Sequence, residues 1–273
     1  MRPRPSPGTR NWQAMMFNPS GDSLTAPALD SFGGALSVVV IGATGGIGGA
    51  FLAALEAAPG VARVFALSRR PLAPSSPKTT WQAVDLEDEE AIARAAASVR
   101  AAAGPLHLVI VASGLLHDGD LQPEKTWRSL SAAGLQRAFA VNTIGPALAA
   151  KHFLPLLADD RKAVFAVLSA RVGSIADNHL GGWHAYRASK AALNMLVRTL
   201  AVELARRNDR ALCVALHPGT VDTDLSRPFQ THVPQEKLFT PERAAGQLLE
   251  VLDGLSPGHS GGLFAWDGQR IPY

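Results

Sequence analysis

The chain has 273 residues, of which 47% are hydrophobic, so it is long and apolar enough to form a sizeable core. Its formal net charge is +3, but the first 20 residues hold three arginines and no acid, which leaves 23 basic and 23 acidic residues in the remainder. This balance gives no support to nucleic-acid binding, and the lack of an apolar stretch of about 18 residues argues against a membrane span. The single Cys213 excludes an intrachain disulfide and fits a reducing compartment, so we expect a cytoplasmic protein.

Residues 1–35 differ in composition from the rest of the chain. They are rich in Pro, Ser, Gly and Asn and show no steady periodicity, so we expect a disordered or loosely attached extension. No apolar segment follows the arginines, which argues against a secretory signal. An acid-free start that contains arginine is compatible with a transit peptide, and an extended start with Met15 or Met16 as alternative initiators is equally compatible.

From residue 36 onward, short apolar runs alternate with segments of helical periodicity. Strands are predicted at 36–41, 61–67, 81–84, 106–112, 163–168, 211–216 and 262–266. Helices are predicted after the first strand to about residue 58, and at 86–103, 135–157, 183–207 and 241–252, with Pro146 as a candidate kink. Apolar strands separated by helices indicate a parallel sheet covered on both faces. We therefore expect one α/β domain over 36–273, a doubly wound Rossmann-type fold with a seven-stranded parallel sheet.

A glycine-rich turn, Gly42-Ala43-Thr44-Gly45-Gly46-Ile47-Gly48, lies between the first strand and the first helix. Glycines leave the backbone amides open, and the dipole of the following helix favours a negative charge, so the turn suits a phosphate group. The spacing differs from G-x-G-x-x-G, and such a turn in isolation is often only a tight turn. Its place after the first strand of an alternating chain favours nucleotide binding.

Tyr186 and Lys190 lie four residues apart on a predicted helix, where side chains at that spacing share one face. An ammonium beside a phenol stabilises the phenolate and lowers the phenol pKa from its usual value of about 10. A tyrosine tuned in this way can exchange a proton near neutral pH. Taken alone, the pair is also what an ordinary amphipathic surface helix contains.

In their order along the chain, these motifs resemble those of the short-chain dehydrogenase/reductase family. Gly42-x-x-x-Gly46-x-Gly48 is similar to the family's T-G-x-x-x-G-x-G, with Ile41 in place of the Thr, and Tyr186-x-x-x-Lys190 is similar to its Y-x-x-x-K. The resemblance extends from about residue 36 to the end. Several stretches look closest to the subgroup of C-factor and sniffer-type carbonyl reductases, namely Gly173-Ser174-Ile175, Gly181-Gly182, 186–194 and Phe264-Ala265-Trp266-Asp267-Gly268.

The resemblance implies a role for each matching residue. Tyr186 would exchange the proton with the substrate oxygen, Lys190 would bind the nicotinamide ribose and lower the pKa of Tyr186, and Asn142 would hold a water that connects Lys190 to solvent. The residues implied to bind the cofactor are Gly42, Thr44, Gly46, Ile47, Gly48, Asp85, Leu86, Gly114, Lys190, Pro218, Gly219, Val221 and Thr223.

Two segments depart from the family pattern. The family's N-N-A-G reads here Val111-Ala112-Ser113-Gly114, in which only the glycine matches. The usual Ser-Ser after the fifth strand reads Ser169-Ala170, and the usual spacing back from Tyr186 falls on Gly173. Ser169 and Ser174 are therefore the candidates for the hydroxyl that polarises the substrate. We favour Ser169 for its place at the carboxyl end of the strand, where such sheets bind ligands.

The second predicted strand is followed by Arg69 and Arg70 instead of an acid that would bind the ribose diol of NAD. Arginine can pair with a 2′-phosphate, so NADP(H) is favoured over NAD(H), although a solvated basic loop would look the same. No metal is expected, because His179, His184 and His217 lack ligand spacing.

The leading functional hypothesis is an NADP(H)-dependent oxidoreductase that acts on a small carbonyl or alcohol substrate. The alternative is a nucleotide-binding signalling or regulatory protein of C-factor type with little or no turnover, which Ala170 motivates. The resemblance implies a homodimer or homotetramer formed through the helices at 135–157 and 183–207. Residues 226–240 are expected to form the substrate loop, in which Phe229 and Phe239 either line an apolar pocket or pack the loop down.

Overall fold

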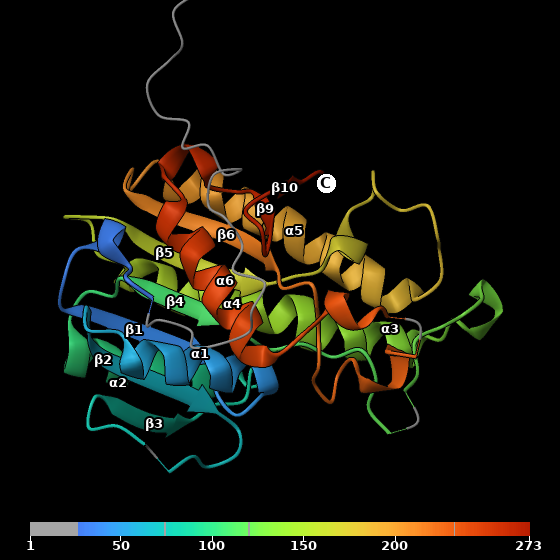
Figure 1. Cartoon of the computed structure of the whole chain (residues 1–273), viewed down its shortest axis with the longest axis horizontal. Coiled ribbons are helices and arrows are strands. Elements are labelled where there is room, and N and C mark those ends of the chain that lie inside the picture. The colour runs from blue at the N-terminus through green and yellow to red at the C-terminus, as the bar shows by residue number, and fades with distance from the viewer. Residues whose placement is uncertain (1–26, 74, 120, 232) are drawn as a thin grey trace, which may run out of the picture.

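The computed structural model describes residues 27–273 apart from residues 74, 120 and 232, and it consists of a central sheet between two layers of helices (Figure 1). The sheet has the strand order β10-β9-β6-β5-β4-β1-β2-β3. Its strands are β1 (Leu36–Ile41), β2 (Val61–Ser68), β3 (Thr79–Ala83), β4 (Leu108–Val111), β5 (Ala163–Leu168), β6 (Ala211–His217), β9 (Leu263–Ala265) and β10 (Arg270–Ile271).

Seven of these strands are parallel, as predicted, and they occupy the predicted positions to within a few residues. The eighth strand, β10, pairs antiparallel with β9 and was missed because it has two residues and no apolar run. A separate two-residue pair, β7 (Thr220–Val221) with β8 (Leu238–Phe239), was missed for the same reason. The strand order reverses between β1 and β4, and in such sheets the ligand binds at this point, outside the carboxyl ends of the strands.

The side chains of each central strand alternate between two apolar layers. One layer packs Val39 and Phe165 against α2 (Glu89–Ala103), α4 (Gly145–Phe153) and α5 (His184–Leu204). The other packs Val38 and Val164 against α1 (Gly46–Ala57) and α6 (Pro241–Gly254). Burial of both faces explains why the central strands read as continuous apolar runs.

The helix predicted at 135–157 is divided in the structure. α3 (Ala132–Phe139) leads into a π-helical turn over Ala140–Ile144, which is followed by α4 and a 3-10 turn over Leu154–Leu156. Pro146 has no N–H to donate to the carbonyl of Asn142, and the Gly145 N–H bonds the carbonyl of Ala140, five residues back. The proline thus marks a π turn, a feature often found at functional sites.

The packed domain begins before the predicted boundary at residue 36. Leu29 and Phe32 are each only 1% exposed and belong to the layer that contains α6. The Lys162 ammonium donates to Ser31 Oγ and to the carbonyls of Leu252 and Asp253, which fastens this segment to the end of α6. Residues 27–35, expected to be part of a disordered or loosely attached extension, are thus packed on the domain through two large apolar side chains; residues 1–26 lie outside the described residues. Within the part of the chain that the structure describes, no helix is long and apolar enough to cross a membrane.

Candidate active site

The glycine turn has steric requirements that only glycine meets at two positions. Gly42 has a φ of 87°, in the left-handed region. A Cβ on Gly48 would lie under 3.0 Å from the carbonyl oxygen of Gly42, so the two ends of the turn are in close contact. No side chain caps the first turn of α1, whereas Asp88, Ser131 and Thr240 cap α2, α3 and α6. The N-terminus of α1 therefore suits an anionic group.

Ser113 adds an independent observation at this turn. Its hydroxyl is buried and has no hydrogen-bond partner among the described residues, and its backbone nitrogen would be 3.3 Å from a Cβ on Gly42. A buried hydroxyl without a partner is unfavourable unless a ligand or water satisfies it. The residues present thus fit a nucleotide cofactor, and Ser113, which the sequence marked only as a departure from the family pattern, belongs to this site.

The segment from Pro218 to Thr223 closes the same site from the other end of the chain. A Cβ on Gly46 would lie 2.6 Å from Thr223 Cγ2, so this segment touches the start of α1. Gly219 has a φ of 81°, and a Cβ there would lie 2.8 Å from the Phe239 ring. Val221 is buried in β7. The structure therefore brings the first and last predicted cofactor motifs together.

The residues predicted at the adenosine end lie along the neighbouring strand ends. Arg69 and Arg70 follow β2 and are exposed, and Arg70 Nη2 donates to the carbonyl of Thr44 at 3.3 Å. Asp85 Oδ1 accepts the Glu87 N–H at 3.1 Å, and Leu86 is buried. Arg70 thus lies beside the glycine turn, where a 2′-phosphate would require it, and Arg69 is exposed next to it in the chain.

Tyr186 and Lys190 lie on the first two turns of α5, on the face expected. Lys190 is 2% exposed, its Nζ lies 5.8 Å from the centroid of the Tyr186 ring, and it donates to the carbonyl of Leu168 at 2.9 Å. Burial lowers the pKa of Lys190 to about 8 and raises the pKa of Tyr186 to about 12. The expected lowering of the Tyr186 pKa is not present, because burial disfavours the phenolate as it disfavours the ammonium.

The two candidate serines are both buried and both engaged with other groups. Ser169 is 4% exposed and donates to Asn194 Oδ1 at 2.7 Å, while Ser174 is 1% exposed and accepts the Asp177 N–H at 3.1 Å. Neither is hydrogen bonded to Tyr186 in the described structure. Gly173, the position given by the family spacing, packs closely against the backbone of Lys190. A Cβ on Gly173 would lie 2.8 Å from the Lys190 carbonyl carbon.

Asn142 holds the loop after β4 to α5. Its Oδ1 accepts the Leu115 N–H at 2.7 Å, and its Nδ2 donates to the Leu115 carbonyl at 2.8 Å and to Ser189 Oγ at 3.1 Å. Sequence reasoning missed the roles of Ser189 and Asn194, which are buried beside Lys190 and Leu193 in the structure. Gly114 lies nearby, because a Cβ there would be 3.9 Å from both Asn142 Oδ1 and Lys190 Nζ.

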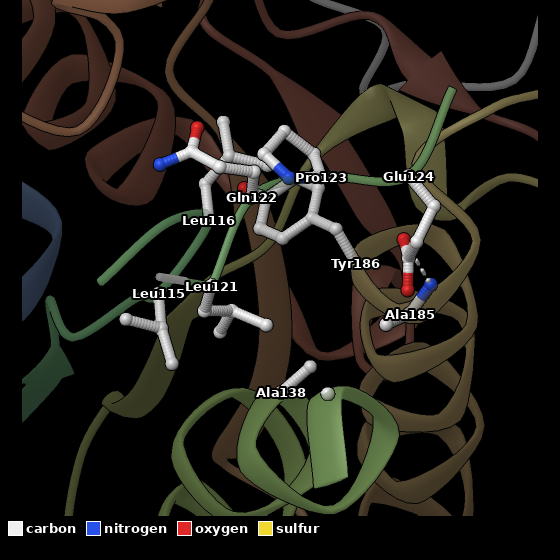
Figure 2. Close-up of a pocket in the computed structure, with 10 residues that line it drawn as sticks. Leu115, Leu116, Leu121, Gln122, Pro123, Glu124, Ala138, Ala185 and Tyr186 are labelled. Atoms are coloured by element: carbon white, nitrogen blue, oxygen red, sulfur yellow. Dashed lines mark hydrogen bonds between the residues drawn. The ribbon is translucent and has the colours of Figure 1, made fainter. Parts of the chain in front are cut away.

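The substrate side of Tyr186 is mostly apolar. Tyr186 lines a cavity of about 10 Å³, roughly the size for one water molecule, together with the loop after β4 and the end of α3. Figure 2 shows these side chains, with the Glu124 carboxylate directed toward Ala185. In the predicted substrate loop, Phe239 is buried against Trp266, with ring centroids 4.8 Å apart, whereas Phe229 contacts Trp183 at 5.1 Å. Phe239 thus packs the loop down, and Phe229 lies against Trp183, whose ring centroid is 6.3 Å from that of Tyr186.

The three histidines considered for a metal do not converge. Across residues 27–273, leaving out the three undescribed positions, no group of three or more His, Cys, Asp or Glu side chains could hold a metal ion. Burial, together with the nearby Arg171, lowers the pKa of His217 to about 4, so this imidazole is neutral at physiological pH.

Comparison with known proteins places this geometry in a family. A family model described as short chain dehydrogenase matches residues 37–234. The chain belongs to that family. As a short-chain dehydrogenase it is an oxidoreductase, and the family resemblance of its motifs is confirmed. The C-signal protein of Myxococcus xanthus is 40% identical over 141 residues, which cover 52% of this chain and 80% of the relative.

Solved structures support the same assignment. The NADPH-bound carbonyl reductase from chicken fatty liver has a TM-score of 0.76 at 31% identity, covering 88% of this short-chain dehydrogenase and 100% of that chain. The carbonyl reductase Sniffer of D. melanogaster has a TM-score of 0.77 at 24% identity with the same coverage, and shows the fold alone. An uncharacterised oxidoreductase of Schizosaccharomyces pombe is 28% identical over 255 residues, covering 86% of this chain and 96% of that protein.

Proposed function

We propose that the protein is an NADP(H)-dependent carbonyl reductase in which Tyr186 is the proton donor. The observation that carries this proposal is the placement of Tyr186 and the buried Lys190 ammonium at the carboxyl edge of the sheet, beside a glycine turn that fits a nucleotide. In the reaction, the carbonyl carbon gains a hydride and the carbonyl oxygen gains a proton. The nicotinamide, when bound, supplies the hydride.

The two pKa values favour reduction of a carbonyl at neutral pH. With a pKa of about 12, Tyr186 carries its proton at neutral pH and can donate it to the substrate oxygen. The charge left on the phenol oxygen forms near the Lys190 ammonium, which stabilises it more strongly there than in water because the ammonium is buried. We assign to Lys190 the role of stabilising that charge.

We assign the second hydrogen bond to the substrate oxygen to Ser169. Its hydroxyl lies at the end of β5, one residue after the Leu168 carbonyl that accepts from Lys190. Rotation about χ1 would release Asn194 Oδ1 and turn the hydroxyl to the substrate. Ser169→Ala should therefore lower kcat about 100-fold, whereas Ser174→Ala should change it little, since removal of one donor to a developing oxyanion costs about that factor. Equal losses would reject this assignment.

The preference for NADP(H) over NAD(H) rests on the exposed Arg69 and Arg70 and the lack of an acid after β2. The chicken carbonyl reductase, 31% identical, was solved with NADPH, and a Burkholderia multivorans relative with bound NADP shares the fold. Both observations support a 2′-phosphate site beside Thr44, whose carbonyl Arg70 contacts.

NADPH oxidation with a panel of aldehydes, ketones and quinones tests the proposal. The wild-type protein should turn over at least one of them, and Tyr186→Phe should lower kcat by at least about 100-fold while leaving NADPH binding intact. Equal background rates for the two proteins, together with tight NADPH binding, would reject the enzyme and favour the second candidate. That candidate is a nucleotide-binding signalling protein, which the 40% identity to C-signal and the replacement of the usual serine by Ala170 favour.

A homodimer or homotetramer remains part of the proposal. Met195 and Val202 on α5 are 66% and 44% exposed, and Ile144 at the start of α4 is 52% exposed, although all three are large and apolar. Light scattering should give a mass of two or four chains, and Met195→Glu should lower it to that of one chain.

A further inference from the structure

The turn that leads into the catalytic helix has an unusual backbone. Gly181, Gly182 and Trp183 have φ values of 64°, 66° and 51°, so three successive residues are in the left-handed region. Glycine adopts this conformation readily, but a bulky residue such as tryptophan rarely does. Strain of this kind persists only where surrounding contacts enforce it, and it concentrates at functional sites.

Contacts from two sides hold the turn in this conformation. The Trp183 N–H donates to the Glu124 carbonyl at 2.5 Å, and the Ala185 N–H donates to Glu124 Oε2 at 3.2 Å. From the other side, Arg187 Nε donates to the carbonyls of Gly181 and Gly182 at 3.1 and 3.0 Å. The left-handed Trp183 is thus held by the Glu124 backbone and flanked by residues that the Glu124 and Arg187 side chains fix, which indicates that the position of its ring matters.

The ring of Trp183 lies between the catalytic tyrosine and the substrate loop. Its centroid is 6.3 Å from that of Tyr186 and 5.1 Å from that of Phe229, both edge-to-face. Phe229 also meets His117 at 5.8 Å, and His117 Nε2 is 3.1 Å from the carbonyl of Asp224. Rings from three separate loops therefore form a chain, His117 to Phe229 to Trp183, that reaches Tyr186 through Trp183, at distances where aromatic pairs attract one another.

The cavity that Tyr186 lines has about 10 Å³ and is bordered by the loop after β4 and by α3, with neither Trp183 nor Phe229 among its lining residues. A carbonyl compound is larger than this cavity, so it must open a space beside the phenol, where the Trp183 ring lies 6.3 Å away. A flat unsaturated group can replace the aromatic contacts that it breaks, whereas a saturated group of equal size cannot.

We propose that Trp183 is a specificity-determining residue that holds the planar unsaturated part of an aryl or conjugated carbonyl substrate, with Phe229 as the facing wall. This inference rests on the proposed reductase function. It predicts that the enzyme distinguishes flat from puckered substrates of the same size, and that the distinction depends on the indole.

Benzaldehyde and cyclohexanecarbaldehyde form a matched pair of flat and puckered aldehydes for this test. Trp183→Leu should lower kcat/KM for benzaldehyde about tenfold, the worth of one good aromatic pair, and should change kcat/KM for cyclohexanecarbaldehyde less than threefold. Trp183→Phe should restore most of the preference. The matched control is Trp127→Leu, at a tryptophan that is 70% exposed, and it should leave both values unchanged. Equal losses for both aldehydes, or no loss, would overturn the proposal.

Binding measured without turnover separates this inference from the proposed function. On a Tyr186→Phe background with NADPH bound, calorimetry should give tighter binding of benzaldehyde than of cyclohexanecarbaldehyde, and Trp183→Leu should abolish the difference. If the wild-type protein shows no turnover but its preference for binding benzaldehyde depends on Trp183, the proposal for Trp183 stands and the reductase function is rejected. If the protein turns over both aldehydes and Trp183→Leu changes neither binding nor turnover, the reductase function stands and the proposal for Trp183 is rejected. If Trp183→Leu does not fold, Phe229→Leu tests the facing wall with the same pair, and an unchanged preference there rejects the proposal.

Discussion

The cofactor side and the substrate side of this site are built in different ways. The cofactor side is built around a seven-residue turn whose own contact between Gly42 and Gly48 spans only six positions, and Thr223 packs against this turn from the other end of the chain. The substrate side joins residues far apart in the sequence, such as Glu124 with Ala185 and Trp183 with Phe229. The shape of the glycine turn is determined by local steric contacts, and the shape of the substrate side by contacts between loops.

This difference predicts how each side responds to substitution. A local turn fails when a single atom is added, because the backbone has no room to move. A surface assembled from several loops loses only the contact that is removed, since the remaining contacts persist. Single changes should therefore be severe on the cofactor side and graded on the substrate side.

The largest effect is expected at Gly48. Gly48→Ala places a Cβ within 3.0 Å of the Gly42 carbonyl oxygen, and overpacking against backbone costs about 3 kcal/mol or more in unfolding free energy. NADPH binding should be lost at the same time. Gly49→Ala is the control, because its Cβ would have only an ordinary 3.6 Å contact, and alanine in a helix should raise stability by about 0.5–1 kcal/mol. Denaturant unfolding measures the free energy of unfolding, and calorimetry measures NADPH binding. If Gly48→Ala and Gly49→Ala had similar values of both, the steric explanation would be contradicted.

The next largest effect concerns the buried charge of Lys190. Its pKa is about 8 in the folded protein and 10.5 ordinarily, so the folded state penalises the ammonium. The penalty is fully present below pH 8 and is relieved as pH rises from 8 toward 10.5. Lys190→Met should therefore raise the unfolding free energy at pH 7 by up to about 3 kcal/mol, with an advantage that shrinks between pH 8 and 9.5.

Activity should move in the opposite direction to stability in the same experiment. Lys190→Met removes the charge that stabilises the phenolate, so kcat should fall at least about 100-fold. In the wild-type protein, kcat for reduction should be flat at neutral pH and fall about tenfold per unit above pH 8, as the ammonium loses its proton. A Lys190→Met protein that is no more stable at pH 7 would show that Lys190 is not penalised by burial.

The same contrast explains what the sequence could predict. Six of the seven parallel strands were evident because each is largely a buried apolar run, whereas β3 is a partly exposed edge strand. The glycine turn was evident because its requirements lie within seven residues. The partner of Ser169 was not evident, because Asn194 lies 25 positions away and one helix turn beyond Lys190. The left-handed Trp183 was not evident either, since it depends on Glu124 and Arg187 acting together. The Tyr186 pKa was predicted in the wrong direction, because the motif contains the lysine charge but not the burial.

A smaller effect is expected at the arginines after β2. Arg69→Ala and Arg70→Ala should each weaken NADPH binding about tenfold and leave NADH binding nearly unchanged, because only NADPH carries the 2′-phosphate that forms charge-assisted hydrogen bonds. Arg63→Ala, at an exposed arginine within β2, is the matched control. An unchanged ratio of NADPH to NADH affinity in both variants would remove the basis for the cofactor preference.

The smallest effect is expected at Glu124, which joins the loop after β4 to the start of α5. Glu124→Ala removes the acceptor of the Ala185 N–H, and loss of a helix cap costs about 1 kcal/mol in unfolding free energy. Glu124→Gln keeps an acceptor oxygen and should recover most of that stability. Because the backbone carbonyl of residue 124 still accepts from Trp183, the preference for flat aldehydes should weaken only partly in Glu124→Ala. Thermal melting measures the stability, and kcat/KM for benzaldehyde and cyclohexanecarbaldehyde measures the preference. Complete loss of the preference would mean that one side chain, and not several loops together, determines the shape of the substrate side.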